Sequence, residues 1–409
     1  MMRTANEEMT QQALHAHLAS WGLRHLTSDV AYFAWQKEVF TSQELATLHQ
    51  HVEAKRAAIE EPSAEIAFYD LTAAPRAVPV LYSQRYEYYL EIGWRIVRHL
   101  ESAPSVLDVG CGIGILTTFY AQQHPQSNLL GIDRSAASIA LARQRAQELG
   151  ITNVRFECLD MDSDALTGQF DLVVSTHALL QSEQDPGVFS RDWSTFERLV
   201  DAQAQQHFEQ RTGVGRRLDR VCTVLKEQGR MLLFEKTRQL ARRVPFQRAL
   251  AARGLQLLAL PEPVRYRSVE EVTDDGPFYV LGAPPQQKTV PWNEMPEMDQ
   301  EPVLTVEALQ AVSVEGDQPL YENHDSSAQQ DWIHLPDKQI MAQMNRKEPD
   351  GRQLHVERGR AAGFHYLYCA NTYDQRQLIV FEPARAVLLD TYYREITEDM
   401  QRESETPVQ

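Results

Sequence analysis

The spacing of apolar residues changes near residue 104. Ahead of it, apolar residues recur at helical spacing over 8–60 and 83–99, with a proline-bearing irregular segment, 62–79, between these stretches. From 104 to about 283, short apolar runs alternate with helical stretches. Such alternation predicts a parallel sheet covered by helices on both faces.

Seven of the short apolar runs are predicted as strands. They are Ser105–Val109, Asn128–Ile132, Val154–Cys158, Phe170–Ser175, Gly229–Glu235, Leu255–Ala259 and Pro277–Leu281. The helices predicted between them cover residues 115–124, 135–149, 194–226 and 243–253. The third of these helices is expected to break near Gly213 and Gly215. The sequence therefore predicts an α/β domain with a doubly wound sheet.

The C-terminal part of the chain has a different pattern. Residues 284–303 carry five prolines, which predicts a linker. Beyond it we expect strands at Leu354–Arg358, His365–Ala370 and Gln377–Phe381, then a helix from Ala384 to Met400. The predicted organisation is an N-terminal helical region (1–80), an α/β domain (81–283), a linker (284–303) and a small α+β domain (304–409).

Composition and charge narrow the function classes. The net charge is −17, whereas a nucleic-acid surface needs clustered Lys and Arg, so nucleic acid is a disfavoured partner. An arginine-rich stretch at 211–248 is either a solvated helix face with Glu partners or a docking surface for an acidic substrate.

The sequence shows no motif for membrane insertion, secretion or paired cysteines. No apolar run is long enough for a membrane span, and the N-terminus lacks the apolar core of a signal peptide. The four cysteines are scattered without Cys-x-x-Cys, which predicts neither a disulfide framework nor a metal site. We expect a cytoplasmic protein with no membrane partner.

One loop carries most of the chemical information. Residues 105–114 read Ser-Val-Leu-Asp-Val-Gly-Cys-Gly-Ile-Gly, a strand that runs into glycines at alternate positions. Only glycine lets the backbone turn this tightly and approach a ligand closely. A helical pattern begins at Ile115, so free N–H groups at its start favour an anionic group. The loop is predicted to hold a small polar ligand.

With Asp108 two residues before the first glycine, this loop resembles the first motif of the class I S-adenosylmethionine-dependent methyltransferases. Asp133, at the end of the second strand, matches the acid that binds ribose hydroxyls, although Asp there is also a good helix N-cap. Asp160 and Met161 match the adenine-binding positions, with a plain acidic loop as the alternative.

The resemblance covers residues 80–283 and implies a seven-stranded, mostly parallel sheet. In that family the last strand inserts antiparallel between the fifth and the sixth, so Pro277–Leu281 is expected to do so here. S-adenosylmethionine is the implied cofactor. Its implied contacts are Asp108, Gly110, Cys111, Gly112, Gly114, Asp133, Arg134, Asp160, Met161 and Ser175.

Two further groups complete the candidate site. Tyr82, Arg85 and Tyr86 are expected to contact the methionine end of the cofactor or to line the substrate pocket; alternatively they pack on the sheet edge. His177, after the fourth strand, is the candidate general base, with a structural role as the alternative. Its turn lacks the proline motif of nucleic-acid amino-methyltransferases, which disfavours methylation of a base amine.

The predicted function is methyl transfer from S-adenosylmethionine to a small-molecule or protein acceptor. Two alternatives stay open, a non-catalytic cofactor-binding or protein-interaction scaffold and an aminopropyltransferase-like enzyme on the same fold. The latter needs acidic residues where Ser175 and Thr176 stand. The C-terminal domain resembles no family that we recognise, and it is the candidate surface for a homodimer or a protein partner.

Overall fold

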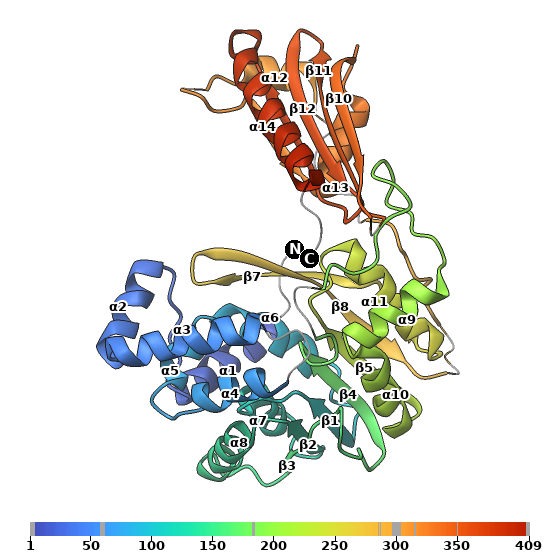
Figure 1. Ribbon diagram of the computed structural model, residues 1–409. Helices are drawn as coiled ribbons and strands as arrows, with labels where there is room; N and C mark the ends of the chain where they lie inside the picture. Colours follow the sequence, from blue (N-terminus) through green and yellow to red (C-terminus); the bar gives the residue numbers. More distant parts are fainter. Residues whose placement is uncertain are drawn as a thin grey trace. The chain divides into compact units, whose positions relative to one another are not determined.

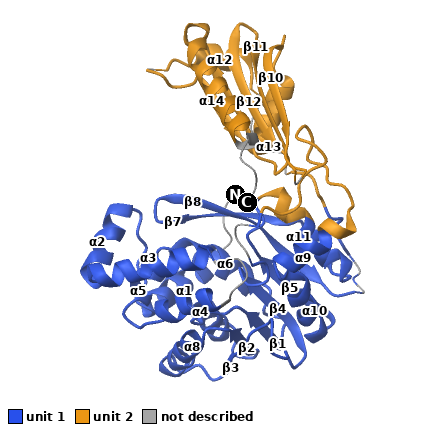
Figure 2. Ribbon diagram, viewed as in Figure 1, with its two compact units in different colours: residues 1–185, 205–238, 245–292 blue, residues 186–204, 239–244, 293–409 orange. Residues whose placement is uncertain are grey.

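The computed structural model describes most of the chain, namely residues 5–57, 62–181, 185–284, 286, 288–296, 304–314, 316–349 and 351–405. Part of the predicted linker, 297–303, lies outside the described residues. The chain divides into two compact units (Figure 2). Unit 1 holds residues 1–185, 205–238 and 245–292, and unit 2 holds 186–204, 239–244 and 293–409.

Unit 1 is built on one large sheet (Figure 1). Its strands are β1 (Ser105–Val109), β2 (Asn128–Asp133), β3 (Val154–Cys158), β4 (Phe170–Thr176), β5 (Leu225–Phe234), β6 (Gln256–Leu257), β7 (Glu262–Ser268) and β8 (Glu271–Gly282). Their order is β3-β2-β1-β4-β5-β8-β6, and β7 pairs with β8. Strands β1 to β5 are parallel, and β8 lies antiparallel between β5 and β6. The predicted fold class and the inserted last strand are confirmed.

The prediction of seven strands was wrong by one, because β7 was missed. β7 forms a hairpin with the first half of β8. Its burial alternates, with Val264 and Tyr266 buried while Arg265 and Arg267 are exposed. This period of two is a strand signal. Pro263 faces its β8 partner Pro277, and prolines are unfavourable in strand interiors, so the segment did not stand out.

Eleven helices of the described chain lie wholly or partly in unit 1, since the first residues of α9 and α11 belong to unit 2. They are α1 (Ala5–Ser20), α2 (Asp29–Val39), α3 (Ser42–Ala57), α4 (Pro62–Thr72), α5 (Val78–Ser83), α6 (Tyr86–Val97), α7 (Ile115–Gln123), α8 (Ala136–Glu148), α9 (Ala202–Arg211), α10 (Val214–Val224) and α11 (Leu240–Ala252). Residues 194–201 are not helical, so the helix expected from 194 begins eight residues late. The break at Gly213 is confirmed, with a φ of +68°.

The irregular segment expected at 62–79 is largely helical instead. Pro62 is the first residue of α4, and Pro79 lies in the first turn of α5. Proline is tolerated there because the first N–H groups of a helix have no partner within it. Only Pro75 lies in a turn between the two helices. The prolines therefore mark helix starts rather than a loop.

The core of unit 1 joins the N-terminal helices to the sheet. One hydrophobic cluster contains Leu14 of α1, Ile92 of α6, Phe119 of α7, Val106 of β1 and Leu172 of β4. Each of these side chains is fully buried. Helices α10 and α11 lie on the other side of the sheet (Figure 1). The N-terminal helices are thus part of the same folded body as the strands that carry the glycine loop.

Unit 2 contains an antiparallel sheet of order β10-β11-β12-β13-β9. Its elements are α12 (Val306–Ala311), β9 (Tyr321–His324), α13 (Asp325–His334), β10 (Gln339–Lys347), β11 (Gln353–Ala361), β12 (Phe364–Asn371), β13 (Arg376–Phe381), a 3₁₀ turn at Pro383–Arg385 and α14 (Ala386–Glu405). The three predicted strands and the last helix are confirmed. The edge strands β9 and β10 were missed, because neither contains a fully buried residue that would mark it as apolar.

Candidate active site

The glycine loop after β1 is folded back on the end of β2. The N–H groups of Gly110 and Cys111 both donate to the carbonyl of Ile132, at 2.8 and 3.0 Å. Gly110 and Gly112 have φ angles of +72° and +54°, which side-chain-bearing residues rarely adopt. A Cβ built on Gly112 would meet no atom within 4 Å. The loop therefore leaves open space beside its backbone.

Asp133 connects this loop to the next helix. Its Oδ2 accepts the N–H of Gly112 at 2.9 Å, and its Oδ1 accepts the N–H of Ser135 at 2.8 Å. The N-cap of α8 is Ser135, whose hydroxyl accepts the N–H of Ser138 at 3.0 Å. Ser135 therefore takes the N-cap role that was the alternative for Asp133. Each of its oxygens keeps a further lone pair for a ligand.

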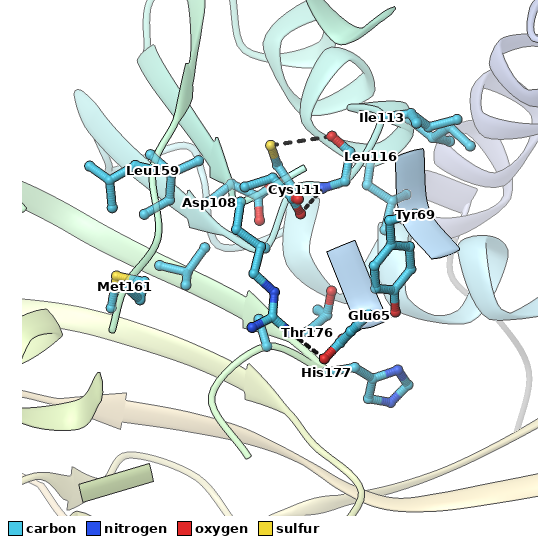
Figure 3. A pocket seen from close by; sticks show the side chains of 18 of the residues that line it. Glu65, Tyr69, Asp108, Cys111, Ile113, Leu116, Leu159, Met161, Thr176 and His177 are labelled. Atoms are coloured by element: carbon cyan, nitrogen blue, oxygen red, sulfur yellow. Dashed lines mark hydrogen bonds and ion pairs between the residues drawn. The ribbon is translucent and has the colours of Figure 1, made fainter. Parts of the chain in front are cut away.

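A cavity of about 170 Å³ opens at the carboxyl ends of β1 to β4 (Figure 3). Figure 3 shows Leu159 and Met161 on one side of it and Tyr69 on the other. Of the residues implied by the resemblance, eight line it: Asp108, Gly110, Cys111, Gly112, Asp133, Arg134, Asp160 and Met161. Tyr82, Arg85 and His177 line it as well.

Three expected site residues lie outside the described lining of this cavity. Gly114 is the N-cap of α7, with a φ of +82°. Ser175 is fully buried, and its hydroxyl donates to Glu235 at 3.1 Å. Tyr86 points toward α1, where its hydroxyl lies 2.8 Å from Nδ1 of His15.

Several lining residues were not predicted. They are Glu65, Tyr69, Tyr88, Tyr89, Val109, Ile113, Ile115, Leu116, Tyr120, Ile132, Leu159, Asp162, Thr176, Ala178, Gln181 and Arg217. Two of them come from α4, which the sequence placed in an irregular segment. Glu65 forms an ion pair with Arg134, and nearby Asp70 accepts the hydroxyl of Ser135 at 2.6 Å. These contacts fix α4 beside the start of α8.

Asp108 is the acid on the strand that leads into the loop. It is 5 % exposed, and its Oδ2 accepts the hydroxyl of Thr117 at 2.6 Å. Burial raises the pKa of Asp108 to about 7, against the opposing effect of that hydrogen bond. Burial likewise raises the pKa of Cys111 far above its ordinary value, so this thiol stays protonated.

The loop after β3 is held in place by arginines of α10. Arg220 donates to the carbonyls of Met161 and Asp164 at 2.5 and 2.7 Å. Arg217, 3 % exposed, forms an ion pair with Asp162 and donates to the carbonyl of Leu179 at 3.0 Å. Two arginines of the basic stretch are therefore internal braces of the cavity wall.

His177 is packed tightly in the turn after β4. Its N–H donates to the carbonyl of Phe234 at 2.8 Å, and its φ is +58°. Its ring centroid lies 5.1 Å from that of Phe234 and 5.4 Å from that of Tyr88. Nη2 of Arg85 donates to Nδ1 at 2.9 Å, while Nε2 lies 3.3 Å from Oδ2 of Asp275.

This arrangement fixes the protonation of His177. A guanidinium can only donate, so Nδ1 is the acceptor and the ring proton sits on Nε2, facing Asp275. Burial lowers the pKa of His177 to about 4, although Asp275 opposes this shift. The ring is neutral at pH 7, and the lone pair that a general base needs is taken by Arg85. A His–Asp pair was not expected from the sequence, because Asp275 lies 98 positions further along the chain.

Glu235, at the end of β5, holds the turn that carries His177. It is fully buried and accepts the N–H groups of Ala178, Leu179 and Leu180 at 3.1 to 3.3 Å. Burial raises the pKa of Glu235 to about 6, and these hydrogen bonds oppose the rise. No local sequence pattern indicates this role.

Two absences concern only the described part of the chain. No helix there is long and apolar enough to cross a membrane. No group of three or more His, Cys, Asp or Glu side chains is arranged there to hold a metal ion.

The comparisons with known proteins agree with this geometry. Residues 100–251 match the protein family described as "Methyltransferase domain". This part of the chain is thus similar to a methyltransferase domain, and the strand order of unit 1 agrees with the class I arrangement expected from the sequence.

Among curated relatives, trans-aconitate 2-methyltransferase of Deinococcus radiodurans is 43% identical over 88 residues, which are 22% of this chain and 32% of the relative. Malonyl-[acyl-carrier protein] O-methyltransferase of Acetivibrio thermocellus is 32% identical over 122 residues, 27% of this chain and 41% of the relative. The chain thus spans less than half the length of these relatives.

Two solved structures are similar to part of this chain. Magnesium protoporphyrin IX methyltransferase from Synechocystis, with bound SAM, is 17% identical, covers 47% of this chain and 78% of its own, and has a TM-score of 0.33. The N-methyltransferase NodS from Bradyrhizobium japonicum is 16% identical, covers 47% and 85%, and has a TM-score of 0.32. The fold assignment rests on the strand order and the family match rather than on these two likenesses.

Proposed function

We propose that the protein is an S-adenosylmethionine-dependent methyltransferase and that the cavity of about 170 Å³ holds the methyl donor. The observation that carries this proposal is the pairing of Gly112 with Asp133. The open space at Gly112 gives a ligand access to bare backbone, and Asp133 presents two acceptor oxygens at the same place. A neutral sugar with two hydroxyl groups fits such acceptors.

The rest of the lining suits the other parts of the donor. Asp160 and Met161 border the end of the cavity where the resemblance puts adenine, and Asp108 borders the glycine loop, where it puts methionine. Bound here, S-adenosylmethionine supplies a methyl carbon that its sulfonium already activates. The protein's own task is then to align the acceptor and exclude water. Arg217 and Arg220 contribute by holding the loop after β3 in one position.

Calorimetric titration of the full chain with S-adenosylhomocysteine tests donor binding. We expect saturable binding with one site per chain. A folded protein that gives no heat would favour the non-catalytic scaffold over the enzyme. A second assay incubates the protein with cell extract and donor carrying a tritium-labelled methyl group, then separates protein, nucleic acid and small molecules. Label transfer that depends on the protein supports the enzyme, and its absence from every fraction contradicts it.

A further inference from the structure

A second cavity, of about 590 Å³, lies among helices α2 to α5. This volume falls within the roughly 300–1,000 Å³ of small-molecule sites. The donor assignment above does not use it. Among its lining residues, only Tyr82 and Arg85 were predicted site residues.

One wall of this second cavity is apolar. Leu45, Leu48 and Val52 share one face of α3, since they stand three and four positions apart. All three are only half-buried, and α3 contains no fully buried residue. Phe33 on α2, which also lines the cavity, is 51 % exposed. Half-buried apolar side chains around a cavity of this size suit a ligand with an apolar body.

The two cavities share part of their lining. Tyr69, Tyr82 and Arg85 border both of them. The hydroxyl of Tyr82 lies 3.5 Å from that of Thr72, and Lys55 Nζ donates to the hydroxyl of Tyr69 at 3.1 Å. These three side chains therefore form the common boundary of the two cavities.

The charged side chains that line the second cavity are mainly cationic. Arg85 donates to His177 and lies 4.0 Å above the ring of Tyr88, and within the described ranges no carboxylate forms an ion pair with it. Lys37, Lys55 and Arg56 also line the second cavity.

Against these cations stands one lining carboxylate, Glu53, which already forms an ion pair with Arg56 at 3.0 Å. A half-buried cation such as Arg85, without a carboxylate partner, is a ready partner for an anionic ligand group.

We propose that the second cavity is the acceptor site and that the acceptor is a carboxylic acid with an apolar body, methylated on a carboxylate oxygen. This inference rests on the proposed function and names its substrate class. The apolar body lies against α3, and the carboxylate meets Arg85 at the junction. There a lone pair of the carboxylate oxygen forms the bond to the methyl carbon while the carbon–sulfur bond breaks and its electron pair returns to sulfur. The products are a methyl ester and S-adenosylhomocysteine, and no proton moves.

The state of His177 agrees with this acceptor. An alcohol or an ammonium group must lose a proton before it can attack, whereas a carboxylate is already ionised at neutral pH. Since Nδ1 of His177 is occupied by Arg85, the junction offers no free imidazole lone pair. Arg85 is thus assigned as a specificity-determining residue that binds the acceptor directly.

Binding experiments use the full chain with saturating S-adenosylhomocysteine. The probes are dodecanoate and cinnamate, which distinguish an alkyl from an aromatic body, each with its methyl ester as the neutral control. We expect at least one acid to bind at least about tenfold tighter than its ester, the effect of one charge-assisted hydrogen bond. Equal affinity of acids and esters, or saturable binding of neither acid, overturns the inference.

Two variants locate the binding. Arg85→Gln should abolish the preference for the acid, whereas Arg76→Gln, an exposed arginine outside both cavities, should leave it unchanged. Leu48→Trp should fill the cavity and weaken acid binding at least about tenfold. Leu71→Trp on the exposed side of α4 is its matched control. Retained S-adenosylhomocysteine affinity shows that each variant is folded.

The outcomes separate this inference from the proposed function. If wild type does not bind S-adenosylhomocysteine, the proposed function fails and takes the inference with it. If Arg85→Gln loses S-adenosylhomocysteine affinity but keeps its preference for the acid, Arg85 holds the donor and only the inference fails. In the labelled-extract assay, mild alkali should release the transferred label as methanol, which only an ester gives; alkali-stable label overturns the inference.

Discussion

Replacing Gly112 by Arg tests the donor site most directly. The backbone there has a φ of +54°, so any side chain adds about 1–2 kcal/mol of left-handed strain. No atom lies within 4 Å of the added Cβ, so the backbone position itself creates no clash. The Arg side chain then extends into the cavity of only about 170 Å³ that we propose for the donor. We expect S-adenosylhomocysteine affinity to fall at least about 100-fold, or about 2.7 kcal/mol.

Gly150→Arg is the matched control. Gly150, after α8, has a φ of +67° and equally open space at its Cβ, but it does not line the cavity. Both variants should therefore lose about 1–2 kcal/mol of unfolding free energy, measured by urea titration. Only Gly112→Arg should lose donor affinity, measured by calorimetry.

Two results would refute this reasoning. A folded Gly112→Arg protein that binds S-adenosylhomocysteine as tightly as wild type places the donor elsewhere. An equal loss of affinity in the Gly150→Arg protein means that strain, not occupation of the cavity, weakens binding.

Three further predictions concern the braces of the site. Burial lowers the pKa of His177 to about 4, so the unfolded chain takes up the extra proton first as pH falls from about 6.5. Between pH 6.5 and 4, the free energy of unfolding should fall by up to about 3 kcal/mol more for wild type than for His177→Gln. Urea titrations in which both proteins lose the same amount would contradict this. Glu235→Gln should lower the free energy of unfolding by about 1–3 kcal/mol, because only one of the two side-chain ends of Gln can accept a hydrogen bond. Glu227→Gln, at an exposed position, should leave the free energy of unfolding unchanged. Arg217→Met should lower stability by about 3 kcal/mol and also weaken S-adenosylhomocysteine binding; unchanged calorimetric and urea values would exclude its role as a brace.

The parts of the site that lie close together in sequence could be predicted. The glycine loop and its preceding strand are one continuous segment, and Asp133 is the last residue of the next strand. Parallel strands bring their carboxyl ends to one edge of the sheet, so local pattern is enough to place these residues. Their positions in the structure follow that expectation, and their contacts with the donor stay a prediction.

Side-chain direction was harder to predict. Successive residues of a strand point to opposite faces, so Thr176 lines the cavity whereas Ser175 faces Glu235. Arg85, the N-cap of α6, and Tyr89 in its first turn both line the cavity, whereas Tyr86 turns away from it. The sequence identified the right segments. Which side chains of each segment face the cavity depended on packing partners elsewhere in the chain.

The remaining partners come from distant segments and no local pattern reveals them. Asp275 reaches His177 only because β7 and β8 form a hairpin whose β8 half also inserts beside β5. Glu65 reaches Arg134 only because two prolines begin helices instead of interrupting them.

The same long-range contacts connect the state of His177 to the nature of the acceptor. Arg85 occupies Nδ1 of His177 and also borders both cavities, so one cation fixes the imidazole and lies between the proposed donor and acceptor sites. An acceptor that needed deprotonation would have to displace Arg85 before His177 could take its proton. A carboxylate needs no such step and pairs with the same guanidinium where it stands. The contact that occupies Nδ1 of His177 therefore supports the acceptor that we propose, one that already carries its charge.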